Sequence, residues 1–363
     1  MLRISRNHGG RVIEKMRTTI ACGGTKSYAI DEDGDIWCFG SQSTVQQIPH
    51  ATGGMVAVAT GCYHALFLDA AGKVWGVGYS SYHSNISSIH KTSSPYPIPL
   101  PEIEIVGIAC GDYHSLLLDA EGFVWASGEN TNGQGGKRNL GSKQSKFSKI
   151  DELQNIRDIK AAAQFSIFLD GDGRVWTCGN FPKGSASSDL RLISAPPIKE
   201  IAAGVYFCLL IDFEGKVWGC GVNDQGQLGD LPQTVHTPTT LQGLPPIRTC
   251  AAGWNFCIFL GEDDSLWTMG CNTHGTLCNG TFSGISRSPI KIAEAPIVVT
   301  VSCGWNHSLF VDCDGNAWCS GEGNNLPFGS SECVSVLSSV GFPKRIQVTA
   351  NMKSKNVKSA RKI

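Results

Sequence analysis

The sequence has few charged side chains and no long apolar run, and both shortages narrow what the chain can be. Charged residues make up 17% of its 363 residues. The longest uninterrupted apolar run, Val205 to Ile211, is far shorter than the ~20 residues of a membrane-spanning helix. No long stretch repeats apolar residues at the i, i+3, i+4 and i+7 spacing of an amphipathic helix. The sequence therefore predicts neither a membrane span nor a helical core.

Signals for metal sites and disulfides are also weak. The 15 cysteines are odd in number and include no Cys-x-x-Cys pair, so we expect no metal site of the usual zinc spacing. No charged segment followed by an apolar stretch opens the sequence, as it would in a secretory signal. We therefore expect reduced thiols and a location in the cytoplasm or nucleus. Cys22, Cys110 and Cys303 each precede a glycine at one recurring position, where they would serve as small core residues.

No constellation typical of covalent catalysis is present. The sequence lacks a Gly-x-Ser-x-Gly elbow, a phosphate loop of the Walker type and a His-Glu-x-x-His helix. Turns such as Asp31 to Gly34 resemble the start of a calcium loop, but without its downstream ligands they predict ordinary hairpin turns. His64, His114 and His307 belong to different repeats, so we expect each to bond backbone within its own repeat rather than to share a metal. We expect no enzyme activity and no cofactor.

Glycine is abundant instead, with 43 residues, and much of it belongs to one pattern that occurs seven times. The pattern runs from an apolar and a small residue to a box position, then through an apolar strand and an acidic turn to a tryptophan. Every box position lies 14 residues before its tryptophan. The box positions are Gly23, Gly61, Gly111, Ala162, Gly204, Gly253 and Gly304. The tryptophans, which we expect to fill the space between packed blades, are Trp37, Trp75, Trp125, Trp176, Trp218, Trp267 and Trp318.

The spacing of these repeats predicts a β-propeller. Successive tryptophans are 38, 50, 51, 42, 49 and 51 residues apart, which matches the ~40–50 residues of a four-stranded blade. A fixed offset within a variable period indicates a rigid hairpin joined by loops of different length. Segments that begin with proline, such as Pro238 to Leu241, are typical of edge strands. The sequence therefore predicts an all-β chain that forms a single seven-bladed propeller with four-stranded blades.

The propeller is expected to span residues 18–349, between a basic N-terminal segment, residues 1–17, and a flexible basic tail, residues 350–363. Pro343 to Val348 resembles the edge segments, and the first repeat has no such segment upstream. We therefore predict that the C-terminal segment closes the ring by joining the first blade, which favours a monomer. Residues 1–17 carry +4 and residues 343–363 carry +7, so a net charge of −1 leaves −12 on the rest. The basic ends could contact nucleic acid or chromatin.

Two repeats continue into a more specific motif. These motifs are Gly128-x-Asn130-x-x-Gly133-Gln134-x-Gly136 and Gly221-x-Asn223-x-x-Gly226-Gln227-Leu228-Gly229. They resemble the regulator of chromosome condensation repeat family of seven-bladed propellers, and the resemblance spans residues 18 to about 349. The family includes a guanine nucleotide exchange factor for the small GTPase Ran, a plant ultraviolet-B photoreceptor and many adaptor modules. The resemblance implies the fold and leaves the activity open.

Two family functions can be compared residue by residue. Gly253-Trp254-Asn255 and Gly304-Trp305-Asn306-His307 resemble the photoreceptor's Gly-Trp-Arg-His motif, but asparagine replaces both arginines. Those arginines hold the light-sensitive homodimer in the family, so we do not expect light sensing here. The exchange factor inserts a wedge hairpin that no segment of this chain matches, and the inserts at 79–94 and 137–149 are candidates by length alone.

The two residues after each box position begin a strand and should lie on one rim of the ring. Aromatic residues exposed on a rim are enriched at binding hot spots, although partial burial under neighbouring loops is an alternative. The predicted partner-binding residues are Tyr63, Asp112, Tyr113, Tyr206, Trp254, Asn255, Trp305 and Asn306. We expect a non-catalytic propeller that binds another protein, within a small-GTPase pathway. The alternatives are nucleotide exchange on a Ran-like GTPase and docking to chromatin or nucleic acid.

Overall fold

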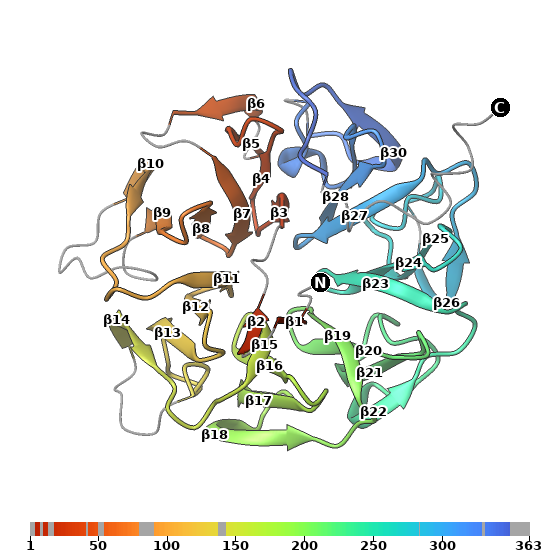
Figure 1. Cartoon of the computed structure of the whole chain (residues 1–363). Helices are drawn as coiled ribbons and strands as arrows, with labels where there is room; N and C mark the ends of the chain where they lie inside the picture. Colours follow the sequence, from red (N-terminus) through yellow and green to blue (C-terminus); the bar gives the residue numbers. More distant parts are fainter. Residues whose placement is uncertain are drawn as a thin grey trace.

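Seven antiparallel sheets of four strands each surround one axis in the computed structural model (Figure 1). The structure describes residues 4–7, 10–13, 18–40, 43–49, 54–79, 91–136, 143–282, 284–328 and 331–348. Within each sheet the strands follow chain order from the axis outward, and each pairs with the next. The predicted all-β, seven-bladed propeller is therefore confirmed.

The blades are numbered in chain order. Blade 1 comprises β3 (Ile20–Cys22), β4 (Lys26–Ile30), β5 (Ile36–Gly40) and β6 (Ser43–Ile48). Blade 2 comprises β7 (Met55–Thr60), β8 (His64–Asp69), β9 (Val74–Tyr79) and β10 (Lys91–Pro97). Blade 3 comprises β11 (Ile105–Cys110), β12 (His114–Asp119), β13 (Val124–Glu129) and β14 (Lys143–Lys149). Blade 4 comprises β15 (Ile156–Ala161), β16 (Phe165–Asp170), β17 (Val175–Asn180) and β18 (Ala186–Ile193).

The remaining blades repeat the same order. Blade 5 comprises β19 (Ile198–Ala203), β20 (Phe207–Asp212), β21 (Val217–Val222) and β22 (Thr234–Thr240). Blade 6 comprises β23 (Ile247–Ala252), β24 (Phe256–Gly261), β25 (Leu266–Cys271) and β26 (Ile285–Lys291). Blade 7 comprises β27 (Val298–Cys303), β28 (His307–Asp312), β29 (Ala317–Gly321) and β30 (Val334–Val340), with a 3-10 turn at Gly323–Asn325. Before blade 1, β1 (Ile4–Asn7) and β2 (Gly10–Ile13) form a separate hairpin.

The antiparallel order distributes the connections over two faces. The turns after the first strand of each blade carry the box positions, and these turns share a face with the loops between the third and fourth strands. We call it the glycine-box face. The opposite face, which we call the hairpin-turn face, carries the turns between the second and third strands and the crossings to the next blade. The predicted edge segments fall on outermost strands, since Pro238 lies in β22 and Pro289 in β26.

A buried aspartate organises the hairpin turn in six blades. In blade 2, the Asp69 carboxylate accepts hydrogen bonds from the amides of Ala71 and Lys73, both at 2.9 Å, and from Nε1 of Trp75 at 3.1 Å. The equivalent indole bonds in blades 1, 3, 4, 5 and 7 measure 2.8–3.1 Å. Gly72 supplies the positive φ of 84° that the turn requires. The turn and the tryptophan are thus fixed by one carboxylate.

Blade 6 lacks this aspartate and reaches the same geometry by another route. Gly261 stands at the aspartate position, and Trp267 donates instead to Oγ of Ser265 at 2.7 Å. Asp264 takes the place of the turn glycine and adopts a φ of 65°, a conformation that aspartate tolerates better than most residues. The substitution that sets the sixth repeat apart in the sequence therefore keeps the turn.

The seven tryptophans lie between blades. Each apolar cluster of the propeller combines buried side chains from two neighbouring blades. The tryptophan of the second blade of each pair, counted around the ring so that blade 1 follows blade 7, packs in the cluster. Trp75 of blade 2, for example, packs with Tyr28 and Ile30 of blade 1. Trp37 and Trp75 are buried, and the other five are partly exposed.

Histidine and serine link three pairs of neighbouring blades near the axis. His64 Nε2 lies 2.8 Å from Oγ of Ser115 in the next blade, and His114 Nε2 lies 2.9 Å from Oγ of Ser166. His307 of blade 7 reaches Ser27 of blade 1 at 2.7 Å. The expectation that these histidines bond backbone within their own repeat was wrong for these contacts. The partner is the next repeat, because the histidine position faces the neighbouring blade.

The C-terminal segment closes the ring, as predicted, but not as an edge strand. Blades 1 and 7 already have their own outermost strands, so residues 343–348 extend the innermost strand of blade 1 instead. Ile346 pairs with Asp31, and the Gln347 amide donates to the Ile30 carbonyl at 3.1 Å. The Ile346 amide also donates to the Gly315 carbonyl of blade 7 at 2.9 Å. In the other blades, the chain that crosses from the preceding blade supplies the first residue of the innermost strand. Blade 1 is the first blade in the sequence, so residues 343–348 supply this residue instead.

Contacts between innermost strands complete the ring. β3, β7, β11, β15, β19, β23 and β27 each contact the next, and β27 contacts β3. Within the described part of the chain, no helix is long and apolar enough to cross a membrane. The predicted tail, residues 350–363, lies outside the described residues, as do residues 80–90 of the first insert and 137–142 of the second.

We predict that a chain ending at Phe342 unfolds more easily than one ending at Val348. The shorter chain loses the burial of Ile346, which is 2% exposed, together with the backbone bonds that close the ring. Burying an isoleucine contributes ~1.5–3 kcal/mol and each net hydrogen bond ~0.5–1.5 kcal/mol, so the free energy of unfolding should fall by roughly 3–5 kcal/mol. Urea denaturation measures the difference. Equal midpoints for the two chains would show that the closure does not stabilise the ring.

Candidate functional site

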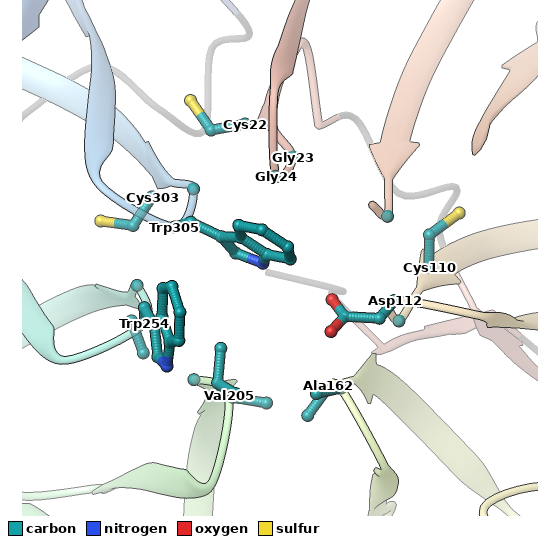
Figure 2. Close-up of a pocket in the computed structure, with 18 of the residues that line it drawn as sticks. Cys22, Gly23, Gly24, Cys110, Asp112, Ala162, Val205, Trp254, Cys303 and Trp305 are labelled. Carbon is teal, nitrogen blue, oxygen red and sulfur yellow. The ribbon is translucent and has the colours of Figure 1, made fainter. Parts of the chain in front are cut away.

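The box turns converge at the axis on the glycine-box face. A side chain at Gly61 would overlap the carbonyl oxygen of Gly111 in the next blade, and one at Gly304 would overlap that of Gly23. Glycine at these positions therefore permits the close approach of neighbouring turns. The tight inner circle leaves a pocket of about 130 Å³ on the axis, lined by residues of all seven blades, and we call this pocket the channel mouth (Figure 2). The pocket is lined mainly by backbone and small side chains of the box turns.

In six of the seven blades, the residue that directly follows the box position lines this pocket. Asp112 of blade 3, Val205 of blade 5, Trp254 of blade 6 and Trp305 of blade 7 all line it. Trp254 is 39% exposed, and Trp305 is half-buried. Their rings lie with centroids 5.3 Å apart at an angle of 52°. The structure thus brings together three of the predicted partner-binding residues, which come from blades 3, 6 and 7.

Trp305 reaches over the channel mouth toward Asp112. Figure 2 shows the indole nitrogen directed toward the carboxylate, and this proximity favours the ionised form of Asp112. The same indole lies close to Gly24 of blade 1, where an added Cβ would come within 3.2 Å of the ring. One side chain of blade 7 therefore lies close to blade 1 and faces a carboxylate of blade 3.

Burial raises the pKa of Asp112 from 3.8 to about 6, the Trp305 indole opposes this shift, and the nearby Glu129 carboxylate adds to it. Among the described lining residues, the other ionisable groups are the thiols of Cys22, Cys110 and Cys303, whose pKa values burial also raises. The pocket therefore offers a carboxylate, aromatic surface and backbone, and none of its described lining residues is a basic side chain.

The second residue after the box position points away from the pocket. Tyr63, which is 46% exposed, packs against Tyr113 with centroids 5.6 Å apart, and these two belong to blades 2 and 3. Tyr206 is half-buried, and the ammonium group of Lys183 lies 4.6 Å from its ring centroid. We call the second residues after the box positions the outer circle. Its aromatic residues flank the mouth without lining it.

The two asparagines at the second position after the box, Asn255 and Asn306, are half-buried. Asn306 Nδ2 also donates to the Glu322 carboxylate at 3.2 Å. This burial fits the alternative of partial burial for the pair. The eight predicted residues thus divide into three at the mouth, three aromatic residues around it and two half-buried asparagines.

Lys183 and Val205 were not predicted. The expectation that the two residues after the box position begin a strand was wrong, because the second strand starts at the third residue, as at His64. The offset from the box position is the signal that separates the two circles. Lys183 carries no such signal, since it lies in the loop between the third and fourth strands of blade 4. Nowhere in the described ranges do three His, Cys, Asp or Glu side chains gather to form a potential metal site.

We predict that Asp112→Asn stabilises the protein at pH 7. Because the folded pKa of about 6 exceeds the ordinary 3.8, ionised Asp112 lowers the free energy of unfolding above pH 6, and this penalty disappears below pH 4. Asparagine removes the charge and keeps an acceptor oxygen on the side that faces the Trp305 indole. The gain should be about 1–3 kcal/mol at pH 7 and near zero at pH 4. Thermal melts at both pH values, with the exposed Asp230→Asn as control, measure it. A gain that is equal at both pH values would contradict this origin.

Comparisons with known proteins agree with this architecture. The human WBSCR16 crystal structure superposes with a TM-score of 0.73 at 21% identity, over 83% of this chain and 84% of that one. Yeast RCC1 (Prp20) bound to Kap60 gives 0.70 at 20% identity, over 82% and 79%. Prp20p from Saccharomyces cerevisiae gives 0.72 at 18% identity, over 98% and 87%. At these identities the likeness shows the fold alone.

The sequence itself decides the family. A comparison with curated proteins finds no significant match. The model of the RCC1-like domain, in contrast, matches residues 43–361, which is most of the chain. This protein therefore belongs to the RCC1-like domain family.

Proposed function

We propose that this chain is a non-catalytic interaction propeller that binds another protein at the channel mouth of the glycine-box face. The observation that carries the proposal is the exposed aromatic surface at the mouth, where Trp254 packs on Trp305. Exposed aromatic residues that are held by neighbouring elements are the usual anchors of protein interfaces. The Tyr63 and Tyr113 pair extends the same surface over blades 2 and 3.

The scaffold supports this role because it holds the mouth rigidly. Each mouth residue directly follows a box turn that packs against the next blade, so its backbone has little freedom. A preformed aromatic surface loses less conformational entropy on binding than a flexible loop does. The pocket also contains no pairing of a nucleophile with a base among the described lining residues. Recognition is therefore the activity that this geometry favours.

We predict that a photo-crosslinking residue at Tyr63 captures a partner that the same residue at Phe213 does not capture. Phe213 is the matched control because it is 68% exposed and lies in a turn on the hairpin-turn face. The expected result is one protein crosslinked from the glycine-box face, whose affinity can then be measured. Equal capture from both positions would contradict binding at the mouth.

For that partner, the double substitution Trp254→Ala and Trp305→Ala should weaken binding by about 30-fold or more, which corresponds to ~2 kcal/mol. The melting temperature should change little, because neither residue belongs to an inter-blade apolar cluster. Phe213→Ala should leave the affinity unchanged. Titration calorimetry measures all three proteins. A large fall in melting temperature would instead show that the two tryptophans are structural.

Guanine nucleotide exchange on a Ran-like GTPase is the alternative. Its support is the likeness in fold to Prp20p, whose crystal structure is described with its binding to Gsp1p and histones. We could match the family's wedge hairpin to no segment of the sequence, so we predict that catalytic amounts of this protein do not accelerate release of fluorescent GDP from a Ran-type GTPase. Acceleration would overturn the adaptor proposal. Docking to chromatin would involve the basic ends, and it predicts binding that weakens steeply with salt.

A further inference from the structure

The channel mouth has a marked electrostatic character. Asp112 supplies the one carboxylate of the lining, and none of the described lining residues is a lysine, arginine or histidine. Glu129 lies near enough to Asp112 to add to the negative potential. The faces of the Trp254 and Trp305 rings carry negative quadrupole charge as well. A cation would therefore be attracted to this mouth, whereas a phosphate would be repelled.

The geometry leaves room for a cation. The carboxylate of Asp112 faces the Trp305 indole, and its two oxygens offer about four acceptor positions. The pocket holds about 130 Å³, which is roughly ten times the ~10–15 Å³ that one water requires. An ammonium or guanidinium group on a long side chain fits that space, and the partly exposed indoles border it.

The same face already contains one example of this chemistry. Lys183 places its ammonium group 4.6 Å from the ring centroid of Tyr206, in the outer circle of blade 5. A cation at this distance from an aromatic ring is attracted to the negative face of the ring. Trp is a better partner than Tyr in such contacts. At the mouth, however, no basic side chain of the described lining residues stands over the two tryptophans.

We propose that the channel mouth receives one basic side chain, a lysine or an arginine, from the protein partner. The charged head lies between Asp112 and the indoles of Trp254 and Trp305, and the aliphatic stem passes the tyrosine pair at the rim. This inference rests on the proposed function and deepens it, because it names the chemistry that the partner must present. A partner with an acidic or phosphorylated anchor would not fit.

The test uses the full chain with ¹⁵N-labelled tryptophan and three small probes. The probes are Nα-acetyl-lysine methylamide, the corresponding arginine compound, and the lysine compound with an acetylated, neutral side chain. The chain has nine tryptophans, seven in the blades and two at the mouth. Trp254→Phe and Trp305→Phe assign the two mouth indole signals. The basic probes should shift these two signals in a saturable way and leave the seven blade signals in place.

Two carboxylate variants provide matched controls. Asp112→Asn should weaken binding of the basic probes by about tenfold, while Asp230→Asn, an exposed position outside the pocket, should have no effect. Melting curves establish that both variants are folded. The proposal is overturned if the neutral probe binds as well as the basic probes, if both variants behave alike, or if the blade indoles shift together with those at the mouth.

The outcome can be separated from that of the proposed function. If the tryptophan double variant loses the captured partner but Asp112→Asn retains it fully, the mouth is the interface and the cation hypothesis is wrong. If the basic probes bind at the mouth but the double variant retains the partner, the pocket accepts cations and the proposed interface is wrong. Comparison of the affinities of the lysine and arginine probes also shows which side chain the mouth prefers.

Discussion

The buried aspartate that ends the second strand is the constraint from which most of this architecture follows. Its carboxylate satisfies two amides of the hairpin turn and the indole of the tryptophan six residues later, as in Asp69 and Trp75. The bond orients a large ring toward the preceding blade, and that ring packs into a core shared by two sheets. A buried carboxylate without hydrogen-bond partners would lower the free energy of unfolding. The aspartate therefore favours the turn, the position of the tryptophan and the packing between blades at the same time.

Near the axis a second set of contacts depends on pairs of repeats rather than on single ones. A histidine after the box turn faces a serine of the next blade in three places, whereas Phe207 in blade 5 stands opposite Cys257 of blade 6 at the equivalent positions. Burial lowers the pKa of His114 to about 3 and that of His307 to about 4, so both remain neutral near pH 7. These pairings therefore hold neighbouring blades together beside the box turns.

The sequence predicts the repeats well, because each hairpin is local and its spacing is fixed. Blade number, edge strands and ring closure could all be inferred from Trp, Gly and Pro positions. Contacts between repeats were harder, since neither His114 with Ser166 nor Ile346 with blade 1 leaves a periodic signal. At the site, the box rule found Asp112, Trp254 and Trp305, but treated the inner and outer circles as one. The approach of Trp305 to Asp112 spans nearly half the ring in blade order, and no local pattern could have predicted it.

The way the ring closes has a consequence for its topology. Thr19 Oγ1 donates to the Gln347 carbonyl at 3.0 Å, so the first and last segments of the propeller meet where the innermost strand of blade 1 begins. At that junction hydrogen bonds replace the covalent link that joins every other pair of neighbouring blades. Blades 7 and 1 otherwise share an apolar cluster, as the other neighbouring blades do. The propeller therefore has no privileged starting blade. A circular permutant that joins these segments and opens the chain at another crossing would retain all seven blades with the same neighbours.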